Sequence, residues 1–442
     1  MLLRRICPTT LEIPDDIYEE LFKTYPQFVP YLDILRTRAS LDTVAWHALV
    51  GPPGSCGETP SVCREFVRSV LQPIATHRHR FDVDQYTKFE SGRRDTSYLS
   101  TETLVNLNPN YWSIPTRQEV EEMIRSMGKE PERHINLQWG DPYPSRSVNQ
   151  IKYRCSAAAV AIRFLESLSK DSRSSITSII LNEDRAAVAF AECHGLGLVP
   201  YCRENPRLRV ERRVNMWRTV FQTTTGNDKS EICYVDETFL ARDISISMAV
   251  WIVEALELNS AGMPPGSFAL TFDGDWACSE MFQTVVQRDA AWQAAIDLCL
   301  DRKFLPPLPY HERRKDPRNF DGGADNGDCW RRDNRWYLFE AFPQAIRDIV
   351  DGNSIVKCNF ALGEAWDVER LVEQNKEWSF ADWKAGWYDR EKETFEPDPP
   401  SPSWVQLRCE NSWDARLPLV ISEEPDLEHL EYLMGNEWPI FF

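Results

Sequence analysis

Along the first 140 residues, apolar side chains recur at the three- and four-residue spacing of amphipathic helices. This spacing predicts helices over residues 15–35, 62–71 and 115–127, joined by long irregular stretches. We therefore expect residues 1–140 to form a mainly helical N-terminal region.

Two of these helices carry start signals of their own. Ser61 precedes the second helix as its expected cap, and Pro73 stands just beyond its expected end. Thr116 and Glu119 have the spacing of a capping box, in which each side chain bonds the backbone N–H of the other residue. The third helix is thus predicted to begin beside Thr116.

From residue 150 the pattern changes to a helical stripe followed by a short strand. Strands are predicted over 176–181, 208–216 and 268–272, with apolar residues at every second position in the last two, and one more helix–strand unit over 345–362. Such a rhythm is typical of a parallel sheet with helices packed on it. The predicted fold class is mixed α/β, with either an open parallel sheet or an irregular leucine-rich-repeat-like curve.

The expected organisation has five parts. After the helical region 1–140 comes a helix–strand core at 150–304, a loop or domain boundary at 305–335 and the last helix–strand unit at 336–363. The final part, 364–442, is acidic and rich in tryptophan.

The last part has an unusual composition. It contains 19 Asp or Glu against 7 Lys or Arg, a net charge of −12, and Trp378, Trp383 and Trp387 fall within ten residues of one another. Tryptophan is enriched where protein surfaces dock, so these three are candidate interaction residues. The alternative is that the segment folds back and buries them as anchors against the body of the chain.

Charge limits the classes of partner. The chain has 68 acidic and 50 basic residues, a formal net charge of −18, which disfavours binding to nucleic acid. Apolar runs are too short for a signal peptide or a membrane span. Twelve cysteines are scattered without a CxxC pair, as in reducing compartments. We expect a cytoplasmic or nuclear protein whose partner is another protein, with no membrane contact and no cofactor.

Carboxylates follow several predicted strands. Glu183 and Asp184 come after the first, and Asp273 and Asp275 after the third. The carboxyl ends of parallel strands meet at one edge, where oxygen ligands can hold Mg²⁺ or Mn²⁺ for hydrolysis or phosphoryl transfer. The other interpretation is that these side chains cap the helices that follow.

Arginines crowd the second predicted strand. Arg207, Arg209 and Arg213 alternate with apolar residues and are expected on a solvated outer face, with anion or phosphopeptide binding as an alternative. Arg212 falls on the apolar face instead. We therefore predict that Arg212 pairs with a buried carboxylate.

The stretch FLESLSKDSRSSITSIILNED (164–184), continued by AECHGLGLVPYCRENPRLRVERRVNMWR (191–218), resembles a family of uncharacterised intracellular proteins of filamentous fungi. It is also similar to the region after the F-box in fungal F-box-like proteins. IPDDIYEELF (13–22) and DTVAWHAL (42–49) echo the start and end of an F-box. The resemblance implies an adaptor in ubiquitin ligation and implies no catalytic activity.

Nucleotide-binding glycine motifs, a nucleophile elbow and a zinc-protease motif are all absent from the sequence. The function predicted best is a protein-interaction scaffold or adaptor without catalytic activity. Two alternatives stay open: a metal-dependent hydrolase or phosphotransferase using Glu183, Asp184, Asp273 and Asp275, and a degenerate F-box-type substrate adaptor.

Overall fold

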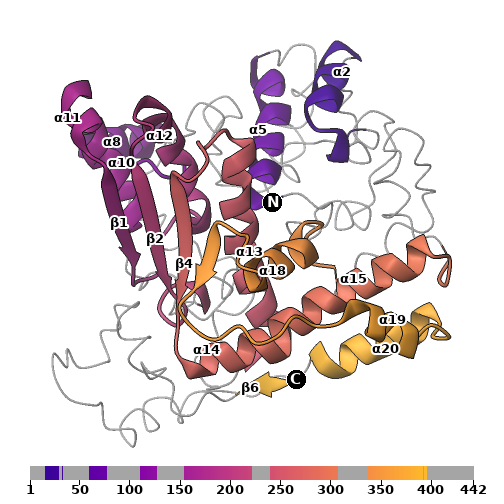
Figure 1. Cartoon of the computed structure of the whole chain (residues 1–442). Helices are drawn as coiled ribbons and strands as arrows, with labels where there is room; N and C mark the ends of the chain where they lie inside the picture. The colour runs from indigo at the N-terminus through magenta and orange to yellow at the C-terminus, as the bar shows by residue number, and fades with distance from the viewer. Residues whose placement is uncertain are drawn as a thin grey trace, which may run out of the picture.

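The computed structural model in Figure 1 describes residues 15–28, 32, 59–76, 110–126, 154–221, 239–306, 337–391 and 393–395. Most of the predicted boundary at 305–335 lies outside these residues.

Four parallel strands form the central sheet, which confirms the mixed α/β class. The strands are β1 (Ser178–Glu183), β2 (Arg209–Asn215), β4 (Phe268–Asp273) and β5 (Val356–Cys358). Their order in the sheet, β1-β2-β4-β5, follows their order in the chain, and each neighbouring pair is parallel. A chain-ordered sheet has no point at which the strand order reverses, and such a point is where open α/β sheets place ligands.

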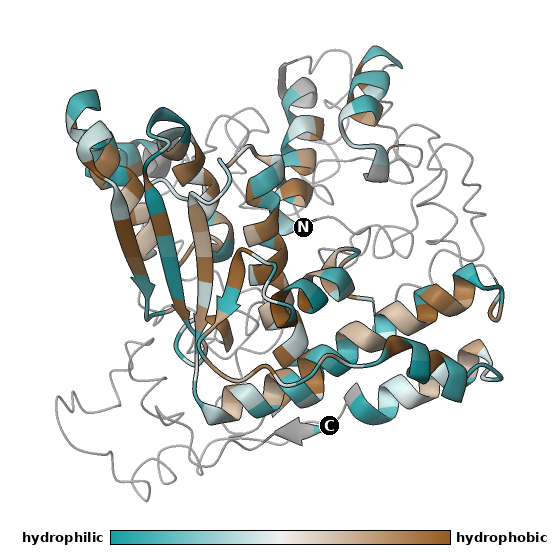
Figure 2. Cartoon of the chain, viewed as in Figure 1, coloured by the Kyte–Doolittle hydropathy of each residue, from teal (hydrophilic) through white to brown (hydrophobic). Residues whose placement is uncertain are grey.

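The helices that precede and connect the strands lie on one face of this sheet (Figure 1). They comprise α10 (Ala157–Ser167), α11 (Lys170–Ser175), the 3-10 helix η4 (Ala191–Leu198), α12 (Val199–Glu204), α13 (Ala241–Ser260) and α18 (Phe342–Val350). Val210 and Val214 of β2, and Leu270 and Phe272 of β4, point into the core that these helices close. Residues that face the core therefore alternate along β2 and β4 with residues that face away from it. Figure 2 shows that β1 is mainly apolar in its middle and that β2 is mainly polar.

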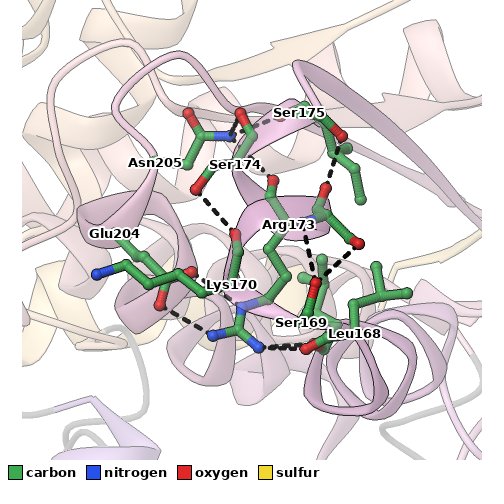
Figure 3. Close-up of polar contacts among 11 residues, drawn as sticks. Leu168, Ser169, Lys170, Arg173, Ser174, Ser175, Glu204 and Asn205 are labelled. Atoms are coloured by element: carbon green, nitrogen blue, oxygen red, sulfur yellow. Dashed lines mark hydrogen bonds and ion pairs between the residues drawn. The ribbon is translucent and has the colours of Figure 1, made fainter.

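A polar cluster around Arg173 and Asn205 joins the amino ends of β1 and β2 (Figure 3). Arg173 donates from Nε and Nη2 to the two carboxylate oxygens of Glu204, at 2.9 and 3.0 Å, and from Nη1 to the Leu168 carbonyl at 2.7 Å. Asn205 donates to the Ile176 carbonyl at 2.7 Å. These bonds satisfy carbonyls that the ends of α10 and α11 leave free, and they tie both helices to α12.

The N-terminal helices agree with the predicted pattern in part. They are α2 (Asp15–Thr24), η1 (Pro26–Phe28), α5 (Pro60–Thr76) and α8 (Arg117–Ser126). The capping box is confirmed, because the Thr116 N–H donates to Glu119 at 2.6 Å and the Glu119 N–H donates to Thr116 Oγ1 at 3.2 Å.

The predicted start and end of α5 were wrong. The helix begins at Pro60, and Thr59 Oγ1 accepts the Val62 N–H at 3.3 Å as the cap. Proline suits the first helical position, which needs no N–H donor. The predicted cap, Ser61, instead donates its N–H to Glu254 of α13 at 2.6 Å. The helix also continues through Pro73.

One long helical rod follows β4 and supports the C-terminal elements. It consists of α14 (Trp276–Met281), the π-helical turn η6 (Phe282–Val286) and α15 (Gln287–Asp301). Beyond β5 the chain runs back along this rod to α19 (Val368–Gln374) and α20 (Phe380–Glu391), as Figure 1 shows. A two-residue strand, β6 (Thr394–Phe395), then pairs antiparallel with β3 (Phe239–Leu240).

The π-helical turn holds the segment that runs along the rod. Gln283 donates to the Ala361 carbonyl at 3.0 Å, and Gln287 donates to the Leu362 carbonyl. Gly363 has a φ of +74°, and a Cβ there would lie 2.8 Å from the Gln283 side chain. Only glycine fits both the left-handed backbone and this close approach.

Candidate functional site

The face of the sheet turned away from the helices is the candidate site, and we call it the open face. Strand register places its side chains in rows across the sheet, one running through Ile180, Glu211 and Ala269 and the next through Asn182, Arg213, Thr271 and Lys357. The open face consists of Ser178, Ile180, Asn182, Arg209, Glu211, Arg213, Ala269, Thr271 and Lys357.

Solvent reaches the open face. Ile180 is 53% exposed, and Asn182, Arg213 and Lys357 are also exposed. Parallel sheets are usually covered by helices on both faces. Solenoid proteins such as leucine-rich-repeat horseshoes are the exception, and they use the bare strand surface to bind other proteins.

The open face offers charges of both signs and uncharged polar groups. Arg213 donates to both carboxylate oxygens of Glu211, at 2.8 and 3.1 Å. These hydrogen bonds, with the charges of Arg213 and Lys357, outweigh the opposing effect of burial and lower the pKa of Glu211. Asn182 and Lys357 stand at the two ends of the same row. Such a surface can bind a polar surface of another molecule through hydrogen bonds and ion pairs.

The outward direction predicted for the arginines of β2 is confirmed. Arg207, Arg209 and Arg213 are all exposed. Arg207 donates to the Ser174 carbonyl at 3.0 Å and Arg209 to the Pro206 carbonyl at 2.7 Å. Arg213 is paired with a carboxylate, so these guanidinium groups already have partners within the chain. Anion binding there stays a prediction.

Behind the open face, Arg212 and Glu183 form a buried ion pair, as predicted for Arg212. Their side chains are 1% and 2% exposed, and Nη2 and Nε of Arg212 lie 2.6 and 2.9 Å from Oε1 of Glu183. Arg212 also donates to the Ala191 carbonyl of η4 at 2.7 Å, and its guanidinium lies 4.8 Å from the centre of the Trp251 ring of α13. This residue thus joins β1, β2, η4 and α13.

Glu183 also caps a helix. Its carboxylate accepts the Ala157 N–H at 2.7 Å and the Ala158 N–H at 3.1 Å, at the start of α10. Burial opposes the charged form, but the charge of Arg212 and these hydrogen bonds outweigh it, so the pKa of Glu183 is lowered. Glu183 is therefore a charged structural group that is fully engaged.

A buried serine–histidine pair lies beside this ion pair, and sequence reasoning missed it. Ser156 Oγ lies 2.7 Å from His194 Nδ1 and accepts the Ala159 N–H at 3.0 Å, and His194 Nε2 lies 2.7 Å from the Ala189 carbonyl. The carbonyl can only accept, so Nε2 carries the proton and Ser156 donates to Nδ1. Burial lowers the pKa of His194 to about 4, which keeps it neutral. Ser156 and His194 are each 1% exposed, so solvent does not reach the pair and its role is structural.

The carboxylates at the end of β4 act mainly as caps. Asp275 accepts the Ala277 N–H at 3.1 Å and the Trp217 indole N–H at 3.0 Å, and Asp273 accepts a hydrogen bond from Asn359. Asp184, in contrast, points to solvent near Arg185. Among the described residues, no three His, Cys, Asp or Glu side chains are grouped so that they could hold a metal ion. The metal-dependent alternative stays a prediction without a supporting cluster in this part of the chain.

The tryptophans that we predicted as interaction residues are buried or partly buried in the fold. Trp383 and Trp387 of α20 are 1% and 3% exposed, and Trp378 is partly buried beside them. The Trp383 ring packs edge-on to Trp292 of α15 at 5.2 Å and to Trp378 at 5.4 Å. The prediction that they face a partner is therefore wrong for Trp383 and Trp387, and the alternative, docking back on the body, describes them.

A second buried carboxylate joins the N-terminal helices to the body. Glu254 of α13 accepts the Ser61 N–H and lies 3.6 Å from Arg64 of α5. Burial raises the pKa of Glu254 to about 7, against the lowering effects of Ser61 and Arg64, and Glu192 nearby raises it further. Glu254 thus holds α5 against the body through a group that titrates near neutral pH.

Comparisons of the chain with protein-family models, with curated proteins and with solved structures find no match. The resemblance to fungal F-box-like proteins therefore stays a prediction. Its N-terminal motif begins before α2, and residues 42–49 lie outside the described part of the chain. Within the described helices, none is both long and apolar enough to cross a membrane.

Replacement of Arg212 by Met will lower the free energy of unfolding by about 3–5 kcal/mol, because the charge of Glu183 is left buried without its partner. The matched control is Arg213→Met, the next residue on the strand, which breaks an exposed pair and should cost about 0–1 kcal/mol. Urea unfolding measures both.

The pKa of Glu183 is lowered, so the stabilisation is present above the ordinary pKa near 4.5 and is lost as the pH falls through the lowered value. The gap between wild type and Arg212→Met should shrink in acid.

Replacement of Glu254 by Gln will also change the pH dependence of the free energy of unfolding. The stabilisation from Glu254 is lost as the pH rises, whereas that from Glu183 is lost as the pH falls. A pKa raised from 4.5 to about 7 gives a contribution that is present below pH 4.5 and is lost as the pH rises through 7. The groups facing Glu254 are Ser61 and Arg64 of α5 and Glu192 and Cys193 of η4. Gln keeps the acceptor for Ser61 without the charge. Melting temperatures at pH 5 and pH 8 should therefore show the variant gaining on the wild type as the pH rises, and an equal difference at both values would contradict this.

Replacement of Trp383 by Ala will lower the free energy of unfolding by about 3–5 kcal/mol, because it empties the contact between α20 and Trp292. Trp276, which is 62% exposed, is the matched control, and its replacement by Ala should cost about 0.5 kcal/mol or less. Equal costs in guanidinium unfolding would show that the tryptophan cluster does not hold α20 in place.

Proposed function

We propose that this chain is a protein-interaction scaffold or adaptor that binds its partner on the open face. The observation that carries the proposal is a parallel sheet in chain order with helices on one face and solvent on the other. That architecture leaves the strand surface available, as in solenoid proteins that bind partners along exposed strands.

The chemistry of the open face supports recognition of a polar protein surface. The row through Asn182, Arg213, Thr271 and Lys357 presents amide, guanidinium, hydroxyl and ammonium groups at about 4.8 Å from strand to strand. These groups stand on strands and not on loops, so their spacing is fixed before a partner arrives. Preorganisation of this kind lowers the entropy cost of binding.

The ion pair behind the sheet supports the same function. Arg212 and Glu183 join β1 and β2, the two strands that carry most of the open face, and both side chains are engaged in bonds within the chain. Catalysis needs a titratable or nucleophilic group that can reach a substrate. In η4, whose Ala191 carbonyl Arg212 bonds, the thiol of Cys193 is buried, and burial raises its pKa to about 12.

Affinity capture from the native cell tests the proposal, with wild type compared to Asn182→Arg and Lys357→Glu. Both positions are exposed on the open face. We expect each variant to recover its main partner about tenfold less well, corresponding to about 1.4 kcal/mol of binding free energy. The matched control is Lys170→Glu, an equal charge change on exposed α11 at the amino end of the sheet.

The control variant should recover the partner as the wild type does. Retention of the same partner by both open-face variants, with unchanged melting temperatures, would contradict binding on this face.

A further inference from the structure

Two tryptophans outside the cluster at α20 stand at the surface of the helical rod. Trp276, the first residue of α14, is 62% exposed, and Trp366 is 39% exposed. A large exposed indole is costly to leave in water and is enriched at sites where surfaces dock. Neither residue belongs to the open face of the sheet.

The structure holds these two indoles along one stripe. Trp276, Glu280 and Gln283 are four and three residues apart, so they share a face of the rod. The indole N–H of Trp366 donates to the Gln283 carbonyl at 3.0 Å. Trp366 is therefore tied to the far end of the stripe that begins at Trp276.

The segment between β5 and α19 follows this stripe closely. At one end Asn359 accepts the Gly274 N–H at 2.9 Å, and at the other end Gln283 donates to the Ala361 carbonyl at 3.0 Å. Phe360 meets Phe282 of the rod, with ring centres 6.1 Å apart. Because the segment is bound at several points, Trp366 has a fixed position beside the rod.

Exposed carboxylates lie close in sequence to both indoles. Glu280 and Glu364 are exposed beside them, and Asp273 and Asp367 are exposed at the two ends. We call Trp276, Glu280, Glu364 and Trp366 the tryptophan strip. An indole ring attracts cations through its face, and a carboxylate nearby adds to that attraction.

We propose that the tryptophan strip is a docking surface for a lysine- and arginine-rich segment of a partner protein. Charge complementarity selects this occupant, because the exposed Glu280 lies one helical turn from Trp276 and the exposed Glu364 lies two residues before Trp366. The chain's net charge of −18 adds a long-range attraction for a basic segment. Basic side chains stack on Trp276 and Trp366 while Glu280 and Glu364 receive their hydrogen bonds.

The test measures binding of a fluorescein-labelled peptide with alternating Arg, Lys and Ser residues to the full chain by fluorescence anisotropy. The control peptide has citrulline and Gln in place of Arg and Lys. We expect Trp276→Ala and Trp366→Ala each to weaken binding by about fivefold, the effect of about 1 kcal/mol per cation–π contact. Glu280→Lys should weaken it further, and the control peptide should bind poorly to every form.

Two variants on α10 control for general effects. Phe164→Ala removes an aromatic ring that is 54% exposed, and Glu166→Lys makes the same charge change as Glu280→Lys at another exposed site. Both should bind the basic peptide within twofold of wild type. Since Trp276 and Trp366 are exposed, their variants are expected to fold, and the melting temperature checks this.

Three outcomes would overturn the proposal. If Glu166→Lys weakens binding as much as Glu280→Lys, the peptide responds only to the net charge of the protein. If the tryptophan variants bind as wild type does, the indoles are not part of the surface. If Trp276→Ala abolishes a dimer seen by analytical ultracentrifugation and leaves peptide binding intact, the strip binds a second copy of this chain.

Discussion

The structure depends on the buried contact between Arg212 and Glu183. A carboxylate and a guanidinium at this depth are unfavourable unless nearly every hydrogen bond is made, and here the pair is bonded to two strands, the start of α10 and the carbonyls of η4. No apolar pair of similar size could cap α10 and bond η4 at the same time. The pair therefore sets how β1, β2 and their helices fit together, and it lies on the same buried face of β2 as Val210 and Val214, which leaves Arg209, Glu211 and Arg213 on the opposite face.

The division of the sheet into a buried apolar face and an exposed polar face determines where we expect a partner to bind. The inward residues of β2 and β4 complete the core with α10, α13 and α18, and the outward residues form polar rows in solvent. The C-terminal helices do not cover these rows, because their tryptophans are used against α15. At the strand ends, Glu183 and Asp275 are occupied as helix caps, and the open face is exposed where a partner can reach it.

Much of this arrangement could be predicted from local pattern. The alternation in β2 predicted its two faces and identified Arg212 as the one charged residue on the apolar face. The pair Thr116–Glu119 predicted the start of α8. What failed depends on distant contacts. The direction of Trp383 is decided by Trp292, 91 positions earlier in the sequence. Ser61, the predicted cap of α5, instead donates its N–H to Glu254 on another helix. The bond from Ser156 to His194 joins residues 38 apart and has no signal in either sequence neighbourhood.

The central claim is that the main partner binds the open face and not the outer surface of the helices, such as α10, that cover the other face of the sheet. Photo-cross-linking in the native cell measures this directly, with a benzophenone side chain placed at position 182 on the open face or at position 163 on the outer surface of α10. Both positions are exposed, so the probe is tolerated at either. The account predicts one specific cross-linked product from position 182 and none from position 163. A product from position 163 alone would show that the helical side carries the interaction.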